Sequence, residues 1–212
     1  MPDTPDTLGN GIRLAAGLGN PGKEYEGTRH NIGFAVLDHL AKRLGVSFSK
    51  ESKWDASVAR SGTELALLKP MTFMNLSGES VGDYARFHRI PASSSLIVCD
   101  DVALPLGSLR LRREGGSGGQ NGLKSVIIHF STEHVPRLRV GIGGAQSTER
   151  GGSDLSTHVL SRFLPEERSL ADQAIDRAVE AITCVLDRGL EHAMNLYNGT
   201  PSSVTTLQPK QP

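Results

Sequence analysis

Residues 12–45 read IRLAAGLGNPGKEYEGTRHNIGFAVLDHLAKRLG, and this stretch decides the expected fold class. Its first seven residues, IRLAAGL, have the apolar character of a buried strand. After a long polar loop, apolar residues recur at helical spacing up to a stop at Gly45, namely Ile32, Val36, Leu37, Leu40 and Leu44. The stretch therefore predicts a strand, a loop and an amphipathic helix.

The rest of the chain repeats this alternation. DASVARSGTELALLKP (55–70) predicts a hairpin, and SLIVCD (95–100) and RLRVGIG (137–143) predict short strands. Helical patterns cover residues 77–89, 121–130 and 165–189. Because a hairpin makes the sheet mixed, we expect one α/β domain over residues 11–199, with a mixed twisted β-sheet surrounded by α-helices.

Composition limits the classes of protein. The 212 residues include 23 Lys plus Arg and 23 Asp plus Glu, so the formal net charge is zero. Any nucleic acid would therefore have to bind a local basic patch. Two cysteines, Cys99 and Cys184, suggest a reducing compartment. With no long apolar run, we expect a soluble cytoplasmic protein without a membrane partner. Polar residues 1–10 and 200–212 predict a flexible N-terminal extension and a flexible C-terminal tail.

The segment GLGNPG (17–22) matches the glycine pattern of dinucleotide sites, but its context does not. Such a site needs the glycines to open directly into a helix whose N-terminal amides bind pyrophosphate. Here KEYEGTRHN separates them from the helix, and no second strand ends in an acidic residue about 20 positions on. Only the glycines therefore support the hypothesis of a nucleotide-dependent oxidoreductase.

Three asparagines, Asn20, Asn75 and Asn121, lie beside Gly, Pro or Ser where an element begins or ends. Each amide offers a donor and an acceptor, so together they could hold a peptide or ester without adding charge. The alternative is that each asparagine bonds its own turn.

His30 and Asp100 are the candidates for acid–base chemistry. His30 precedes the first helix, where a loop could expose a general base, although a turn histidine could also bond backbone. Asp100 ends the apolar run SLIVCD, where a carboxylate could fix the imidazole tautomer, while a turn cap is the alternative for Asp100 or Asp101. The histidine spacing predicts no metal site.

Residues 107–139 form a basic segment. Six cations, Arg110, Arg112, Arg113, Lys124, Arg137 and Arg139, stand against Glu114 and Glu133. Phosphate contact is one interpretation of this segment. A solvated strand face is the other, because LRLRRE alternates.

Five motifs occur in family order: GLGNPG..Y..TRHN.G, KP.TFMN.SG, DD..LP.G, GG..G.NGLKS and RLR.GIG. From Ile12 to Asn198 the chain resembles the bacterial-type peptidyl-tRNA hydrolase family. The resemblance implies a monomeric enzyme that cleaves the ester between a peptide and the 3′ end of tRNA, recycling peptidyl-tRNA lost from ribosomes without metal or cofactor. It implies that His30 is the catalytic base, that Asp100 orients His30, and that Asn20 distinguishes N-blocked substrates.

The resemblance also implies substrate contacts, at Asn75 and Asn121 for the peptide or the terminal adenosine, at Tyr25 and Phe73 for tRNA, and at Arg112 and Arg139 for the 5′ phosphate. Either aromatic ring could instead be packing. The chain departs from the family pattern at Cys99, Ala103 and Gln120. Two matters stay open: whether a loop at residues 143–157 closes over substrate, and whether the chain is a scaffold that binds RNA or protein without catalysis.

Overall fold

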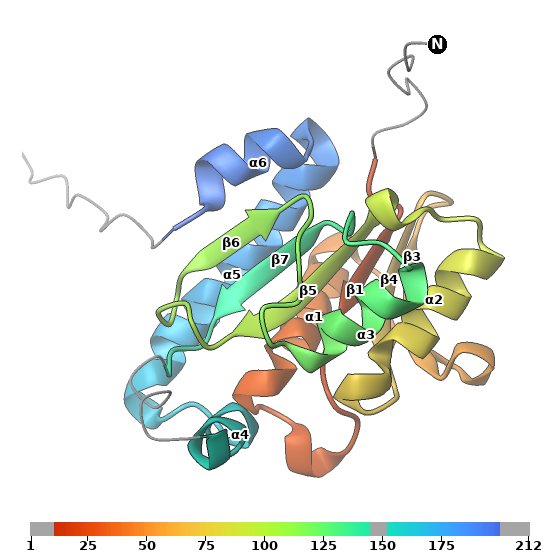
Figure 1. The fold of residues 1–212 in the computed structure, drawn as a ribbon. Coiled ribbons are helices and arrows are strands. Elements are labelled where there is room, and N and C mark those ends of the chain that lie inside the picture. Colours follow the sequence, from red (N-terminus) through yellow and green to blue (C-terminus); the bar gives the residue numbers. More distant parts are fainter. Residues whose placement is uncertain (1–10, 145–151, 200–212) are drawn as a thin grey trace, which may run out of the picture.

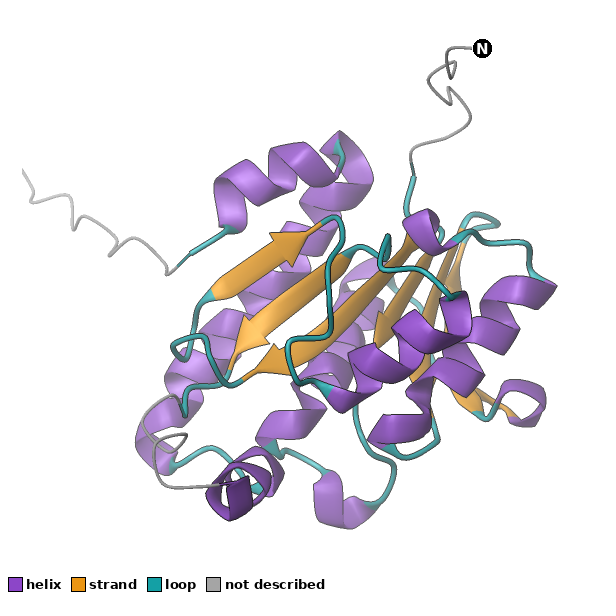
Figure 2. Ribbon diagram, viewed as in Figure 1, coloured by secondary structure: helices purple, strands orange, loops and turns teal. Residues whose placement is uncertain are grey.

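The computed structural model describes residues 11–144 and 152–199. These residues form one mixed seven-stranded sheet with helices on both faces (Figure 1, Figure 2). The sheet has the order β2-β3-β4-β1-β5-β7-β6. Its strands are β1 (Leu14–Gly17), β2 (Ser49–Glu51), β3 (Ala56–Ser61), β4 (Leu65–Pro70), β5 (Ser95–Asp101), β6 (Leu109–Arg112) and β7 (Arg137–Gly141). The predicted fold class is therefore confirmed.

The four central strands β4, β1, β5 and β7 run parallel, and antiparallel pairs lie at both edges. The predicted hairpin is confirmed, since β3 and β4 pair from Ala56↔Pro70 to Ser61↔Leu65. The strand expected at 12–18 is shorter, because only Leu14–Gly17 pairs. The parallel centre brings the carboxyl ends of four strands to one edge of the sheet.

The described residues contain six α-helices. They are α1 (Ile32–Leu44), α2 (Ser77–Phe87), α3 (Asn121–Phe130), α4 (Gly152–Leu160), α5 (Pro165–Arg188) and α6 (Leu190–Tyr197). The apolar positions of α1 and α5 pack on one face with Leu138 and Val140, and those of α2 and α3 pack on the other with Ile97 and Cys99. The amphipathic patterns read from the sequence correspond to these two cores.

The segment between β1 and α1 is the loop that separates GLGNPG from the helix, the feature that does not fit a dinucleotide site. It contains two short 3-10 turns, η1 (Lys23–Tyr25) and η2 (Arg29–Asn31), before α1 begins. The first turn of α1 packs closely on the end of β1: a Cβ on Gly33 would lie 2.5 Å from the carbonyl oxygen of Leu18. Only glycine allows this approach, which fixes η2 beside the end of the sheet.

The proposed domain limits, 11–199, remain a prediction. The expected flexible segments 1–10 and 200–212 lie outside the described residues.

Candidate active site

A pocket of about 610 Å³ lies at the edge where the parallel strands end. Loops after β1, β4 and β5, together with η2, the start of α3 and the middle and end of α4, contribute to its wall. Its polar lining includes Asn20, His30, Asn75, Asp100, Asp101, Gln120, Asn121 and Arg139. This is the region where ligands gather in open α/β sheets.

His30 and Asp100 meet in this pocket. His30 comes from η2 and Asp100 from β5, and the imidazole Nδ1 lies 3.0 Å from the carboxylate Oδ1. Their side chains are 13% and 4% exposed, so the pair is largely shielded from water. A proton on Nδ1 held by the carboxylate leaves Nε2 as the basic nitrogen, which is the tautomer that a general base requires.

Asn20 is held in one orientation by bonds from two directions. Its Oδ1 accepts a hydrogen bond from the backbone N–H of Met74 at 2.7 Å. The side chain of Asn31 bonds both the backbone N–H and the carbonyl of Asn20, at 2.8 and 2.9 Å. Because Oδ1 is occupied, the amide Nδ2 is the group that Asn20 can offer a ligand.

Asn75 and Asn121 stand at starts of helical segments. Asn75 lies in η4 (Met74–Leu76), and Asn121 is the first residue of α3. Both line the same pocket as Asn20, so the structure brings the three asparagines together. A pocket with three amides and a shielded His–Asp pair can position a carbonyl group and remove a proton from water beside it.

Comparison with known proteins identifies the family. A family model described as peptidyl-tRNA hydrolase matches residues 14–205. The chain belongs to the peptidyl-tRNA hydrolase family. The resemblance inferred from the five motifs is therefore confirmed.

Relatives and solved structures agree with this assignment. The chain is 47% identical over 189 residues to a peptidyl-tRNA hydrolase of Caldanaerobacter subterraneus subsp. tengcongensis, covering 88% of this chain and 99% of that one. A peptidyl-tRNA hydrolase of Akkermansia muciniphila is 43% identical, with coverage of 90% and 97%. The crystal structure of the Acinetobacter baumannii enzyme superposes with a TM-score of 0.80 at 38% identity, covering 88% and 96% of the two chains.

Most of the residues expected from the peptidyl-tRNA hydrolase motifs line the pocket, including Phe73, which is 56% exposed. Two do not. Tyr25 is half-buried in η1 and is absent from the lining of this pocket, and Arg112 is exposed on the edge strand β6. A contact with Tyr25 or Arg112 would therefore involve parts of a large substrate beyond the pocket.

Arg137 and Arg139 require a correction to the basic segment. Arg137 is 1% exposed, and its guanidinium donates to the backbone carbonyls of Val135, Gly115, Gly116 and Glu133. Arg139 is 8% exposed and donates to Asp101 Oδ2 at 3.1 Å and to Ser117 O at 2.7 Å. These two charges hold the loop before α3 in place, so the exposed cations are fewer than the sequence count indicates.

The lining of the pocket also includes an apolar wall that the sequence did not suggest. Leu155, Val159 and Leu160 of α4 line it, and their spacing on one helical face was the available signal. The prediction of a loop over residues 143–157 is wrong in its last part, because α4 begins at Gly152. Residues 145–151 lie outside the described residues.

The departures at Cys99 and Ala103 do not change the polar lining. Cys99 is fully buried on the α2/α3 side of β5, and burial raises the pKa of its thiol to about 12. Ala103 donates its backbone N–H to Asp101 Oδ1 at 2.9 Å. Over residues 11–144 and 152–199, no cluster of three metal-ligating side chains occurs, and no helix is long and apolar enough to cross a membrane.

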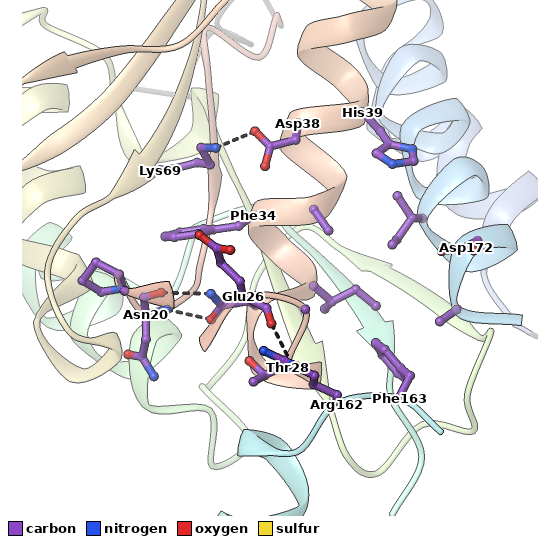
Figure 3. Close-up of a pocket in the computed structure, with 18 of the residues that line it drawn as sticks. Asn20, Glu26, Thr28, Phe34, Asp38, His39, Lys69, Arg162, Phe163 and Asp172 are labelled. Atoms are coloured by element: carbon purple, nitrogen blue, oxygen red, sulfur yellow. Dashed lines mark hydrogen bonds and ion pairs between the residues drawn. The ribbon is translucent and has the colours of Figure 1, made fainter. Parts of the chain in front are cut away.

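A second hollow of about 630 Å³ shares Asn20 with the pocket and lies beside α1 (Figure 3). Figure 3 shows Phe34 and the Lys69–Asp38 ion pair on one side of α1, with Phe163 and Asp172 on the other. Neither His30 nor Asp100 belongs to its described lining. The acid–base groups therefore place the candidate chemistry in the slightly smaller pocket.

Proposed function

We propose that this protein hydrolyses the ester bond between a peptide, or an N-blocked amino acid, and the 3′ end of tRNA, and so recycles peptidyl-tRNA dropped from ribosomes. The observation that carries the proposal is the shielded His30–Asp100 pair, 3.0 Å apart, in a pocket shared with three asparagines of a peptidyl-tRNA hydrolase family member. An ester hydrolase needs a base for water and neutral groups that hold the acyl chain.

In the proposed reaction, His30 Nε2 takes a proton from water as the water oxygen attacks the ester carbonyl carbon. Asp100 holds the ring and stabilises the imidazolium that forms. The tetrahedral intermediate then collapses, the bond to the tRNA 3′ oxygen breaks, and the imidazolium returns the proton to that oxygen. The free peptide acid and intact tRNA are the products.

The asparagines take binding roles in this proposal. Asn20 Nδ2, oriented by the Met74 bond, donates to a carbonyl of the blocked amino acid, which a free α-ammonium group would not provide. Asn75 and Asn121 hold the peptide or the terminal adenosine, and Phe73 offers an exposed ring for stacking.

The tRNA body extends beyond the pocket. We assign Tyr25 and the exposed Arg112 to it, and we assign Arg139 to supporting the loop beside it rather than to a free phosphate contact. A cytoplasmic, monomeric enzyme that needs no metal or cofactor, with one catalytic domain over residues 11–199, completes the proposal.

The test measures release of N-acetyl-amino acid from blocked and unblocked aminoacyl-tRNA in the presence of EDTA. Wild type should cleave the blocked substrate only, and His30→Ala should lose about 10²- to 10⁴-fold in rate. His39→Ala is the matched control, because His39 also contacts a carboxylate, that of Asp176 at 3.1 Å, but is exposed. A folded wild type that binds tRNA without turnover would instead indicate a binding scaffold.

A further inference from the structure

Gln120 occupies the residue before α3 and makes three contacts inside the site. Its Nε2 donates to Asp100 Oδ1 at 3.1 Å and lies 3.2 Å from Met74 Sδ. Its Oε1 accepts the backbone N–H of Leu123 at 2.6 Å, which caps α3. The residue is only 8% exposed, so neither end of its amide is freely hydrated.

The same carboxylate oxygen therefore serves two donors. Asp100 Oδ1 accepts from His30 Nδ1 at 3.0 Å and from Gln120 Nε2 at 3.1 Å. A second donor stabilises the anion and draws charge from the oxygen that faces the imidazole, which weakens the attraction between Asp100 and a protonated His30. The same bond restricts rotation of the carboxylate.

We propose that Gln120 is a positioning residue that sets the basicity of His30 through Asp100. This deepens the proposed function and rests on it. The Gln120 amide binds the same oxygen as His30 and draws its charge away from the imidazole, so loss of this bond should strengthen the attraction of Asp100 for a protonated ring. Because Asn121 follows it, the same side chain joins the catalytic pair to the start of α3.

Other charged groups near the pair are already engaged. On the neighbouring strands Asp101 is paired with Arg139 at 3.1 Å. Arg29, next to His30 in η2, is paired with Glu167 of α5 at 2.5 Å. From α4, His158 Nε2 lies 2.9 Å from the carbonyl oxygen of Gly143. Of the described groups named here, Gln120 is the one that bonds the oxygen facing His30.

Two variants separate the contact with Asp100 from the helix cap. Gln120→Ser keeps a hydroxyl that can accept the Leu123 N–H at the cap position, but it is too short to reach Asp100. Gln120→Glu keeps an acceptor for that N–H and places a second carboxyl group beside Asp100. Gln173→Ser is the control, because it makes the same substitution on the exposed surface of α5.

The decisive readout is the NMR titration of the His30 ring, identified by the signal missing in His30→Asn. We expect the titration midpoint to rise by roughly 0.5–1 pH unit in Gln120→Ser and by roughly 1–2 units in Gln120→Glu, with no change in Gln173→Ser. The acid limb of the kcat/KM profile for N-acetyl-aminoacyl-tRNA should move by the same amounts. Thermal unfolding checks that the variants fold.

A merely structural Gln120 would change the unfolding temperature and leave the His30 midpoint of both folded variants at the wild-type value, and that result overturns the inference. If Gln120→Ser does not fold, the His30 titration midpoint in Gln120→Glu tests the inference by itself. The titration needs no turnover, so a wild type without hydrolase activity would reject the proposed function while the effect of Gln120 on His30 is still measured.

Discussion

Replacing Asp100 by asparagine tests how much of the rate depends on the carboxylate charge. The substitution preserves shape, and two donors, His30 Nδ1 and Gln120 Nε2, converge on one oxygen position. The asparagine oxygen should therefore occupy that position, because its NH₂ group cannot accept either bond. The ring orientation is then retained, and the variant removes the negative charge alone.

The size of the effect follows from the burial of the pair. A hydrogen bond to a charged group contributes about 1.5–3 kcal/mol, and the 4% exposure of the Asp100 side chain leaves little screening by water. In the proposed mechanism the imidazolium forms only as the reaction proceeds, so this stabilisation acts on the transition state. At about 1.4 kcal/mol per factor of ten, we expect single-turnover hydrolysis of N-acetyl-aminoacyl-tRNA to slow by roughly 10- to 150-fold.

Asp176→Asn is the matched control for this experiment. Asp176 contacts His39 at 3.1 Å, nearly the same separation as in the His30–Asp100 pair, but its side chain is 70% exposed. Its loss should leave the rate unchanged. If folded Asp100→Asn hydrolyses the substrate within threefold of wild type, the charge of Asp100 has no role in the reaction, and the mechanism proposed for His30 fails.

Three further predictions concern the surface, the core and the pH dependence of stability. Arg112→Ala should weaken tRNA binding and reduce the slope of log affinity against log salt by about one phosphate contact, and an unchanged slope would return Arg112 to a solvated strand face. Burial raises the pKa of the Cys99 thiol to about 12, so iodoacetamide should label the half-buried Cys184 first in the folded protein and both thiols in urea; early labelling of Cys99 would contradict its burial. Burial alone would raise the pKa of Glu167, but the hydrogen bond from Arg29, with further help from the Leu164 N–H, holds this pKa below 4.5. A carboxyl group whose pKa is lower in the folded state stabilises the fold at pH values above its unfolded-state pKa, and this stabilisation is lost as the pH falls. Glu167→Gln should therefore reduce the urea midpoint at about pH 7 and make little difference at about pH 3.

The central strands and the larger helices could be predicted from the sequence because local patterns specify them. Ile32, Val36, Leu37 and Leu40 are buried at helical spacing, and Gly45 ends α1 with a φ of 68°. The segment 190–197 was missed, since the pattern read through 165–189 gave no sign that a second helix, α6, follows Gly189 directly. A helix of eight residues has a weak periodic signal, and packing against β6 and α5 supports it.

The residues of the His30–Asp100 pair were predicted by type, place and family motif, but their contacts were not. Asp100 and Asp101 are neighbours in SLIVCDD, and the sequence left both open as turn caps. In a strand, successive side chains point to opposite sides, so one carboxylate reaches His30 and the other reaches Arg139. Gln120 appeared only as a departure from the family pattern, because its bond to Asp100 joins residues 20 positions apart.

The sequence by itself determined the mixed α/β class, the loop that separates GLGNPG from a helix, and the family, because each depends on local periodicity or on motif order. The tertiary structure decided which of the arginine side chains are exposed to solvent. Arg137 and Arg139 have the same local signature as Arg110 and Arg112, yet the first two lie in β7, where the loop before α3 covers them, and the others lie on the exposed edge strand. Burial depends on what packs over a strand, and segments distant in the sequence supply that cover.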